Sequence, residues 1–245
     1  MDDLPRPRVR SRVGRVRSYL VPVGLLTALA LAACTGPVAG PVFEPAAAPA
    51  ASPSATPTAT ASPSPAASPS APAVKYVFPV LGKTSYGRTH HDYQATDVMA
   101  PCGATIVAVT DGTVLEVSRV DSWDPKTDDG AQRGGLSVSL LGDDGVRYYG
   151  SHFSAIDGLI RPGERVTAGQ KLGKVGRTGL ASACHLHFGV SPVCARTGDW
   201  WIRRGVVWPW RYLDSWRRNG AKSPVPEVTT WQTRHGCSTT PPPGA

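Results

Sequence analysis

The most informative stretch of the sequence reads His185-Leu186-His187-Phe188. Residues i and i+2 of a β-strand point to the same face of a sheet. On a strand, Leu186 and Phe188 would therefore face a core, and the two histidines would lie side by side on the other face. Two imidazoles so placed can bind one metal ion together, or one can bind metal while the other acts on a substrate. Taken alone, the pattern also fits two half-exposed strand histidines.

Short β-prone runs separated by glycine turns surround this stretch. Strands at such spacing predict an all-β fold, a sandwich or barrel-like sheet of roughly 120 residues. The pairs Asp111-Gly112 and Asp144-Gly145 are hairpin signals between two such runs. The expected strands are 76–80, 105–110, 113–120, 136–141, 146–152, 171–175 and 185–190.

Two further segments have a clear local character. Segment 121–135 contains four aspartates and three glycines, which predicts a surface loop or a lip over a groove. Trp208-Pro209-Trp210, followed by 211–218, predicts a short proline-initiated helix. We expect this helix to dock onto the sheet rather than to contact a polymer. A solvated basic face is the favoured interpretation of Arg203, Arg204, Arg217 and Arg218.

The N-terminus has the pattern of an export signal. Six arginines precede an apolar run over 19–33, which is too short for a comfortable membrane span but suits a signal peptide. The run ends in Leu31-Ala32-Ala33-Cys34, which resembles the bacterial lipoprotein signal, in which the cysteine receives the lipid. An ordinary cleaved signal and an uncleaved anchor are the alternatives, and all three export the protein. We therefore expect a signal peptide over 1–33 and a lipoprotein held by Cys34 on the outer face of the cell membrane.

The charge of the chain does not favour a nucleic-acid partner. The net charge is +8, but residues 1–33 contribute six arginines and two aspartates, which leaves +4 for the remainder. Residues 34–74 are rich in Pro, Ala, Ser and Thr and predict an extended spacer. The folded part should therefore begin near residue 75.

Export also changes the interpretation of the cysteines. If Cys34 carries a lipid, an even four remain, and thiols outside the cytoplasm tend to pair. Two disulfides are therefore expected, with three possible pairings. The pairing of Cys184 with Cys194 is weakly favoured because the intervening loop is short. The spacings lack the close pairs that cysteine zinc sites use. The remaining cysteines are Cys102, Cys184, Cys194 and Cys237.

Three other histidines and one aspartate belong to the same chemistry. His90 and His91 precede Asp97, and His152 ends an expected strand. One His, one Asp and one His make a three-ligand zinc site with an open position for water, which is the arrangement of a catalytic site. With only one of His90 and His91 as a ligand, two histidines outside that pair would then act as acid and base.

Four segments together resemble the lysostaphin/LytM-type zinc metallopeptidases. They are Asp97-Val98-Met99-Ala100-Pro101-Cys102-Gly103, Tyr149-Gly150-Ser151-His152, the glycine-rich stretch 166–176 and His185-Leu186-His187-Phe188-Gly189. The resemblance covers about 78–192, in the family's order. It implies a small antiparallel β fold of the duplicated-hybrid-motif type, one zinc ion per domain, and hydrolysis of peptide cross-bridges of bacterial peptidoglycan through a metal-activated water.

Carried over to this sequence, the resemblance implies that Asp97 and His187 are zinc ligands and that His152 and His185 are catalytic. The first ligand histidine is His91 or His90. The family pattern has three residues between this histidine and the aspartate, whereas His91 leaves five and His90 leaves six. His91 is favoured because it needs the smaller departure from the ligand geometry.

The expected organisation is thus a zinc metallopeptidase domain over 75–196 and a C-terminal extension over 197–245 with a short helix and a polar tail. The predicted function is a zinc-dependent endopeptidase of peptidoglycan. The alternative is a catalytically silent lipoprotein that binds peptidoglycan and activates or recruits another wall hydrolase. Members of that kind typically lack one or more metal ligands, whereas this chain has candidates for all three.

Overall fold

The computed structural model describes residues 74–243. The predicted signal peptide, the lipid site at Cys34 and the spacer through residue 73 lie outside the described residues. Within 74–243, no helix has the length and apolar character needed to cross a membrane. The strands are β1 (Ser85–Tyr86), β2 (Thr96–Met99), β3 (Thr105–Val107), β4 (Gly112–Ser118), β5 (Ser137–Gly142), β6 (Val146–Ser151), β7 (Phe153–Ile156), β8 (Arg165–Val166), β9 (Lys171–Val175) and β10 (His185–Pro192). The helices are α1 (Trp200–Arg203), α2 (Trp210–Trp216) and α3 (Val225–His235).

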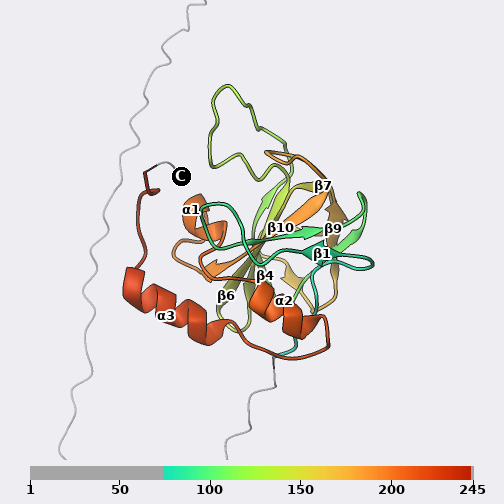
Figure 1. Cartoon of the computed structure of the whole chain (residues 1–245), viewed down its shortest axis with the longest axis vertical. Helices are drawn as coiled ribbons and strands as arrows, with labels where there is room; N and C mark the ends of the chain where they lie inside the picture. The colour runs from blue at the N-terminus through green and yellow to red at the C-terminus, as the bar shows by residue number, and fades with distance from the viewer. Residues whose placement is uncertain (1–73, 244–245) are drawn as a thin grey trace, which may run out of the picture. The chain divides into compact units, whose positions relative to one another are not determined.

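The strands form two antiparallel sheets, which confirms the predicted all-β class. One sheet has the order β1-β2-β10-β6-β5-β4-β8, and the other has the order β3-β9-β7. Figure 1 shows the strands at the centre, with the long loop between β4 and β5 projecting beyond them. The expected strand at 76–80 is wrong, because the chain there makes only an isolated bridge at Val80. Pro79 has no N–H to donate, so a regular ladder cannot continue through it.

Strand β10 organises the larger sheet. It lies between β2 and β6, and all eight of its residues are buried. Leu186 and Phe188 belong to the hydrophobic core, as the alternation predicted. The register sets His187 opposite Asp97 on β2 and opposite Ser151 on β6. Two sequence segments that are 90 residues apart are thereby joined at one point of the sheet.

The predicted helix is present as α2, and it docks onto the sheet as expected. Tyr212, Leu213 and Trp216 are its buried residues. The Trp216 ring stacks on Tyr76 at 5.1 Å between centroids and meets the Tyr148 ring edge-on at 6.2 Å. The burial of these large rings stabilises the packing of α2 against the β core.

Helices α1 and α3 were not predicted. Both contact β10, and they lie on the same side of the strands in Figure 1. Helix α3 occupies part of the segment expected to be a polar tail. Its sequence is polar overall, but Val228 is buried in the core and Trp231 packs against it. A short helix with so few apolar residues gives a weak periodic signal, which explains why it was missed.

The cysteines form two disulfides, as expected, but the favoured pairing is wrong. Cys102 is bonded to Cys184, and Cys194 is bonded to Cys237. Cys184 and Cys194 flank the eight-residue strand β10, which at about 3.3 Å per residue separates them far beyond bonding distance. The antiparallel pairing of β10 with β2 instead brings Cys184 to Cys102.

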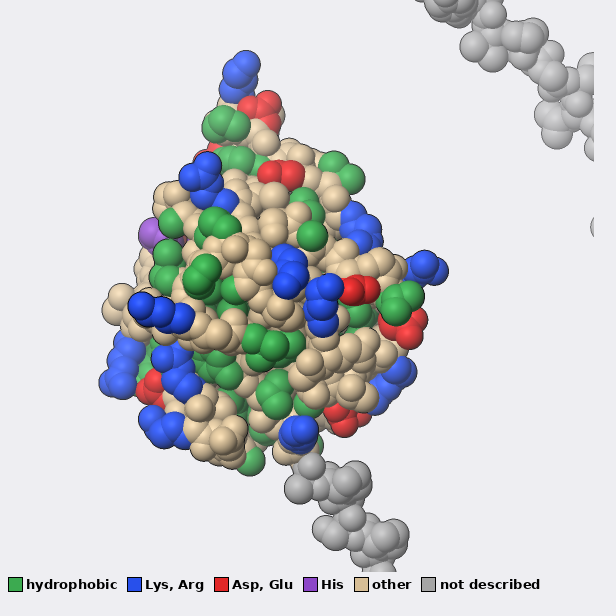
Figure 2. Space-filling view, turned by 90° about the vertical axis from the view of Figure 1, so that its right-hand side faces the viewer, with side chains coloured by type: hydrophobic (Ala, Val, Ile, Leu, Met, Phe, Trp, Pro, Cys, Tyr) green, Lys and Arg blue, Asp and Glu red, His purple; other side chains and the backbone are tan. Residues whose placement is uncertain are grey.

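The basic side chains do not form one patch on the face drawn in Figure 2. Lys and Arg side chains are spread over that face, with Asp and Glu side chains among them. Several arginines are paired: Arg165 with Asp143, Arg88 with Asp214 and Arg211 with Glu227. This face therefore offers no continuous cationic stripe of the kind that binds nucleic-acid backbones.

Candidate metal centre

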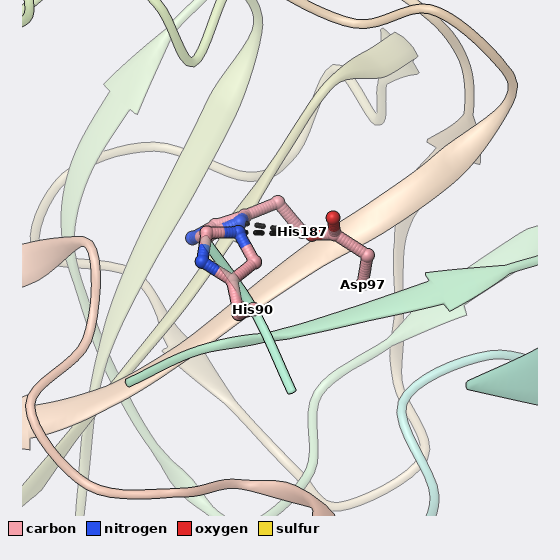
Figure 3. Close-up of side chains that lie close together, drawn as sticks. All are labelled: His90, Asp97 and His187. Atoms are coloured by element: carbon pink, nitrogen blue, oxygen red, sulfur yellow. Dashed lines mark hydrogen bonds and ion pairs between the residues drawn. The ribbon is translucent and has the colours of Figure 1, made fainter. Parts of the chain in front are cut away.

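Strands β2 and β10 place a carboxylate against an imidazole. The Nδ1 atom of His187 lies 3.1 Å from Oδ1 of Asp97. His90, in the loop before β2, places its Nε2 atom 3.6 Å from the same oxygen. The potential ligand atoms of His90, Asp97 and His187 all lie within 4.8 Å of one another. Figure 3 shows both imidazoles beside the Asp97 carboxylate, so these three side chains could hold a metal ion.

The hydrogen bonds of His187 favour a cation at this point. Its Nε2 atom lies 2.9 Å from the backbone carbonyl oxygen of Arg204. A carbonyl oxygen only accepts, so Nε2 carries the hydrogen, and a neutral imidazole then presents a lone pair at Nδ1. The Asp97 carboxylate, which faces that lone pair, also only accepts. A shared cation, either a proton or a metal ion, resolves this contact, and the N, O, N donor set fits zinc.

Gly189 allows the Arg204 carbonyl to come this close. A Cβ atom at Gly189 would lie 2.4 Å from the Arg204 carbonyl oxygen, well inside van der Waals contact. Any larger residue would push the chain at 203–204 away from β10. The glycine of the His-Leu-His-Phe-Gly segment is therefore required by the approach of the backbone that orients His187.

Burial and neighbouring charges shift the pKa values of His90 and Asp97. Desolvation, together with the nearby charge of His187, lowers the pKa of His90 to about 4. The neutral form of His90 is therefore favoured at neutral pH, as a metal ligand requires. Burial by itself would raise the pKa of Asp97, but the contact with His187 and the positive charge that His187, His185 and His90 carry when protonated outweigh it and hold that pKa well below its usual range. Asp97 is thus a carboxylate.

The structure places His90, not His91, beside Asp97 and His187. The His90 side chain is only 4% exposed, and its ring centroid lies 5.1 Å from that of His187. His91 is exposed and lies at the rim of the cavity. The bends over 91–94 take up the extra residues before β2, so the longer spacing to Asp97 is accommodated. The preference for His91 is therefore corrected to His90.

His152 and His185 form a second pair beside the first group. Their ring centroids are 4.7 Å apart. The Nδ1 atom of His152 lies 2.7 Å from the Thr178 carbonyl oxygen, and that of His185 lies 2.9 Å from the Ala183 carbonyl oxygen. Each Nδ1 must therefore donate its hydrogen, which leaves Nε2 able to accept a proton. The Nε2 atom of His185 lies 3.7 Å from Oδ1 of Asp97.

His152 has an unusual backbone and an unusual pKa. It follows β6 with φ +65°, a left-handed conformation that costs energy in a residue other than glycine. Burial and the neighbouring charges of His187 and His185 lower its pKa to about 3. The imidazole is therefore neutral at neutral pH.

The five residues open into one cavity of about 440 Å³. The segment 121–135 forms part of its wall, which confirms the predicted lip over a groove, and Tyr93 also lines the cavity. The loop can approach α1 because Gly130 has no side chain: a Cβ atom there would lie 2.3 Å from the Trp200 ring. The cavity is lined by His90, Asp97, His152, His185 and His187 together with Tyr93, Gly130, Arg133, Tyr149, Trp200, Arg203 and Arg204, among others.

Two arginines expected on a solvated face lie at this cavity instead. The Arg203 guanidinium is 2.8 Å from Glu116 and 4.8 Å from the centroid of the Tyr149 ring. Arg204 packs its guanidinium over the Tyr93 ring at 4.0 Å. That expectation is therefore wrong for Arg203 and Arg204, because α1 turns both back toward the sheet.

Comparison with known proteins agrees with this geometry. Residues 91–197 match the model of Peptidase family M23. The chain is 34% identical over 98 residues to the "Glycyl-glycine endopeptidase ALE-1" of Staphylococcus capitis; the match covers 40% of this chain. It spans only 24% of the length of that relative. Residues 91–197 are thus similar to Peptidase family M23, and part of the chain is similar to a glycyl-glycine endopeptidase.

Solved structures give similar matches. One is a putative peptidase M23 from Pseudomonas aeruginosa, with 26% identity and a TM-score of 0.42, covering 57% of this chain and 50% of that chain. Another is the catalytic domain of the antimicrobial peptidase lysostaphin from Staphylococcus simulans, with 24% identity and a TM-score of 0.41, covering 54% of this chain and 92% of that chain.

Proposed function

We propose that this peptidase M23 domain is a zinc-dependent endopeptidase that hydrolyses peptide cross-bridges of bacterial peptidoglycan. The proposal rests mainly on the three imidazole nitrogens that lie close to one oxygen of the Asp97 carboxylate. Oδ1 of Asp97 lies 3.1 Å from a nitrogen of His187, 3.6 Å from one of His90 and 3.7 Å from one of His185. Three ligands in an open cavity leave room for water and substrate, as catalytic zinc sites do.

In this proposal, His90, Asp97 and His187 hold the zinc ion. The Arg204 carbonyl fixes His187 with its Nδ1 lone pair toward the ion. Bound there, zinc would polarise the scissile carbonyl and lower the pKa of its water toward roughly 7. Asp97 supplies one negative charge, and the two imidazoles remain neutral, so the site keeps a net positive charge when occupied.

In this proposal, His152 and His185 act as the general acid and general base. In its neutral form each would present an unprotonated Nε2, because its Nδ1 donates to a backbone carbonyl. His185 lies nearer to Asp97 and is placed to take the proton of the attacking water. The other histidine stabilises the developing oxyanion or protonates the leaving amine. The depressed pKa of His152, about 3, keeps its imidazole neutral at the start of the reaction.

The relatives support the proposed substrate, and the N-terminal sequence supports the proposed location. The curated relative is named for cleavage of glycyl-glycine bonds. We extend peptide-bond hydrolysis of cell-wall bridges to this chain, which would act on the outer face of the cell membrane, held by a lipid on Cys34. The spacer before residue 75 would let the domain reach the wall.

The test is digestion of isolated peptidoglycan by the purified, zinc-loaded protein, with released fragments identified by mass spectrometry. We expect new peptide ends that disappear with a chelator and in the His187→Ala variant. Wall binding and stoichiometric zinc without any new peptide ends would instead support a non-catalytic lipoprotein that recruits another hydrolase.

A further inference from the structure

The cavity beside the metal centre contains one arginine without a partner. Three arginines line the cavity: Arg133, Arg203 and Arg204. Arg133 is paired with Asp128 at 2.8 Å, and Arg203 is paired with Glu116 at 2.8 Å. The guanidinium of Arg204 makes neither an ion pair nor a hydrogen bond with any residue in 74–243 that the structure records, and its Nε atom is buried without a partner.

Aromatic rings hold the Arg204 side chain in place. Its guanidinium carbon lies 4.0 Å from the centroid of the Tyr93 ring and 5.3 Å from that of the Trp200 ring. Such stacking orients the planar fork while leaving its N–H groups free to donate. An oriented, half-buried cation with unused donors in an open cavity matches a carboxylate, which accepts two parallel hydrogen bonds from a guanidinium.

Arg204 is also in direct contact with the metal centre. The same residue that presents the free guanidinium accepts the hydrogen bond of His187 through its backbone carbonyl. An anion bound by the side chain would therefore lie in the same cavity as His90, Asp97 and His187. Trp200 and Arg204 also follow residue 197, where the match to Peptidase family M23 ends, so the feature belongs to this chain's own C-terminal segment.

One acidic residue competes for this cation. Asp92 lines the same cavity, and its negative charge favours the charged form of both Arg204 and Arg133. No ion pair joins Asp92 to either arginine among the described residues, and Asp92 is exposed. Asp92 thus leaves the Arg204 fork open to an anion from solution.

We infer that Arg204 is a specificity-determining residue that binds a free carboxylate of the substrate next to the scissile amide. The inference rests on the proposed function and names its substrate class: a cross-link peptide with a free carboxylate beside the cleaved bond, rather than an uncharged glycine bridge. Arg204 then positions the peptide, while zinc and the two catalytic histidines act on the amide.

The test compares two synthetic cross-link peptides that differ only in this group, a carboxylate in one and a carboxamide in the other. Binding is measured by titration calorimetry on the zinc-loaded protein, and kcat/KM is measured in parallel. For the wild type we expect the carboxylate peptide to bind about tenfold more tightly than the carboxamide, the size of one charge-assisted hydrogen bond. Arg204→Gln should bind the two peptides about equally and keep its zinc.

Arg161→Gln is the matched control, since Arg161 is exposed and lies outside the cavity. It should keep the full preference of the wild type. An equal affinity of the wild type for the two peptides would overturn the inference, and so would a preference that survives in Arg204→Gln, since zinc itself would then hold the carboxylate. If neither peptide is cleaved, the proposed function fails, yet the binding measurement still decides the role of Arg204.

Discussion

Three backbone carbonyls set the chemistry of the histidines. His152, His185 and His187 each donate one ring N–H to a carbonyl, from Thr178, Ala183 and Arg204 respectively. Each bond fixes which nitrogen carries the hydrogen, and therefore which nitrogen faces the cavity. The histidines could be identified from the sequence, but these carbonyl partners could not, because every residue has a carbonyl and no residue type marks the one that is used.

The proposed function assigns metal binding and proton transfer to different residues, and it therefore predicts that His152 can be replaced without loss of the metal ion. The variant His152→Ala should keep its zinc, because His152 is not in the group formed by His90, Asp97 and His187. Loss of a positioned acid or base should lower kcat about 10² to 10⁴-fold. Metal analysis and peptide turnover of the same preparation test this. Full activity in this variant would remove His152 from the mechanism.

The depressed histidine pKa values predict acid sensitivity of the metal-free protein. The folded-state pKa values of His90 and His152, about 4 and about 3, lie below the 6.5 of an unperturbed histidine. Below pH 6.5 the unfolded chain therefore binds more protons than the folded one. Each histidine should lower the free energy of unfolding by up to about 1.4 kcal/mol per pH unit as the pH falls from 6.5 toward the folded value.

Urea unfolding of the metal-free protein at pH 7, 6 and 5 measures this effect. The His152→Gln variant is the comparison, and its stability should fall less steeply with pH because one of the two histidines is gone. Equal stability at all three pH values would show that burial does not favour the neutral imidazoles.

At the scale of elements, helix α1 depends on a buried ion pair. Arg147 on β6 is fully buried and lies 2.7 Å from Asp199, the residue before α1. The other oxygen of Asp199 accepts a hydrogen bond from the backbone N–H of Ala195. This pair fixes where α1 begins, and α1 leads directly to the Arg204 carbonyl that orients His187. The sequence gives no sign of it, since Arg147 and Asp199 are 52 residues apart.

Removing one partner of this pair should be costly. Asp199→Ala leaves the buried Arg147 charge without a counter-charge, and we expect the free energy of unfolding to fall by about 3–5 kcal/mol. Asp143→Ala, which breaks the exposed pair with Arg165, is the matched control and should cost about 0–1 kcal/mol. Chemical denaturation of the two variants measures both effects. Equal costs would contradict the anchoring role of Asp199.

The strands show what local pattern can predict. Strand β9 has its expected bounds, and β10 extends the expected one by two residues, with Leu186, Phe188 and Val190 alternating along it. Strand β2 was missed, although it carries Asp97, since its four residues Thr-Asp-Val-Met give too short an alternation. The preference for His91 over His90 as the first ligand was based on the number of residues before Asp97. That number gives the spacing along the chain only. The bends at 91–94 decide which histidine side chain points into the cavity.

At the scale of the whole molecule, the two disulfides join segments distant in the sequence. Cys102 and Cys184 are 82 residues apart, and Cys194 and Cys237 are 43 residues apart. The composition and the export signal predicted that the cysteines pair, but the partners depend on the sheet register, which the sequence did not reveal. The first bond also lies next to His185, so it supports the site as well as the fold.

Mass spectrometry of unreduced peptides should therefore find these two bonds. A Cys184–Cys194 peptide would contradict the strand pairing around β10. Replacing Cys102 and Cys184 by serine should lower the free energy of unfolding by about 4 kcal/mol, as expected for opening so long a loop. The Cys194→Ser/Cys237→Ser variant is the comparison. It should lose a similar amount of stability but keep more activity, because it leaves the residue before His185 unchanged.

The central claim is that His90, Asp97 and His187 form a zinc centre that cleaves peptides. The most direct test is zinc stoichiometry and peptide cleavage in the wild type, His90→Ala and His91→Ala, measured on the same preparations. We predict that the wild type and His91→Ala bind one zinc ion and cleave, whereas His90→Ala loses both properties. Retention of zinc and activity in His90→Ala, with their loss in His91→Ala, would contradict the account.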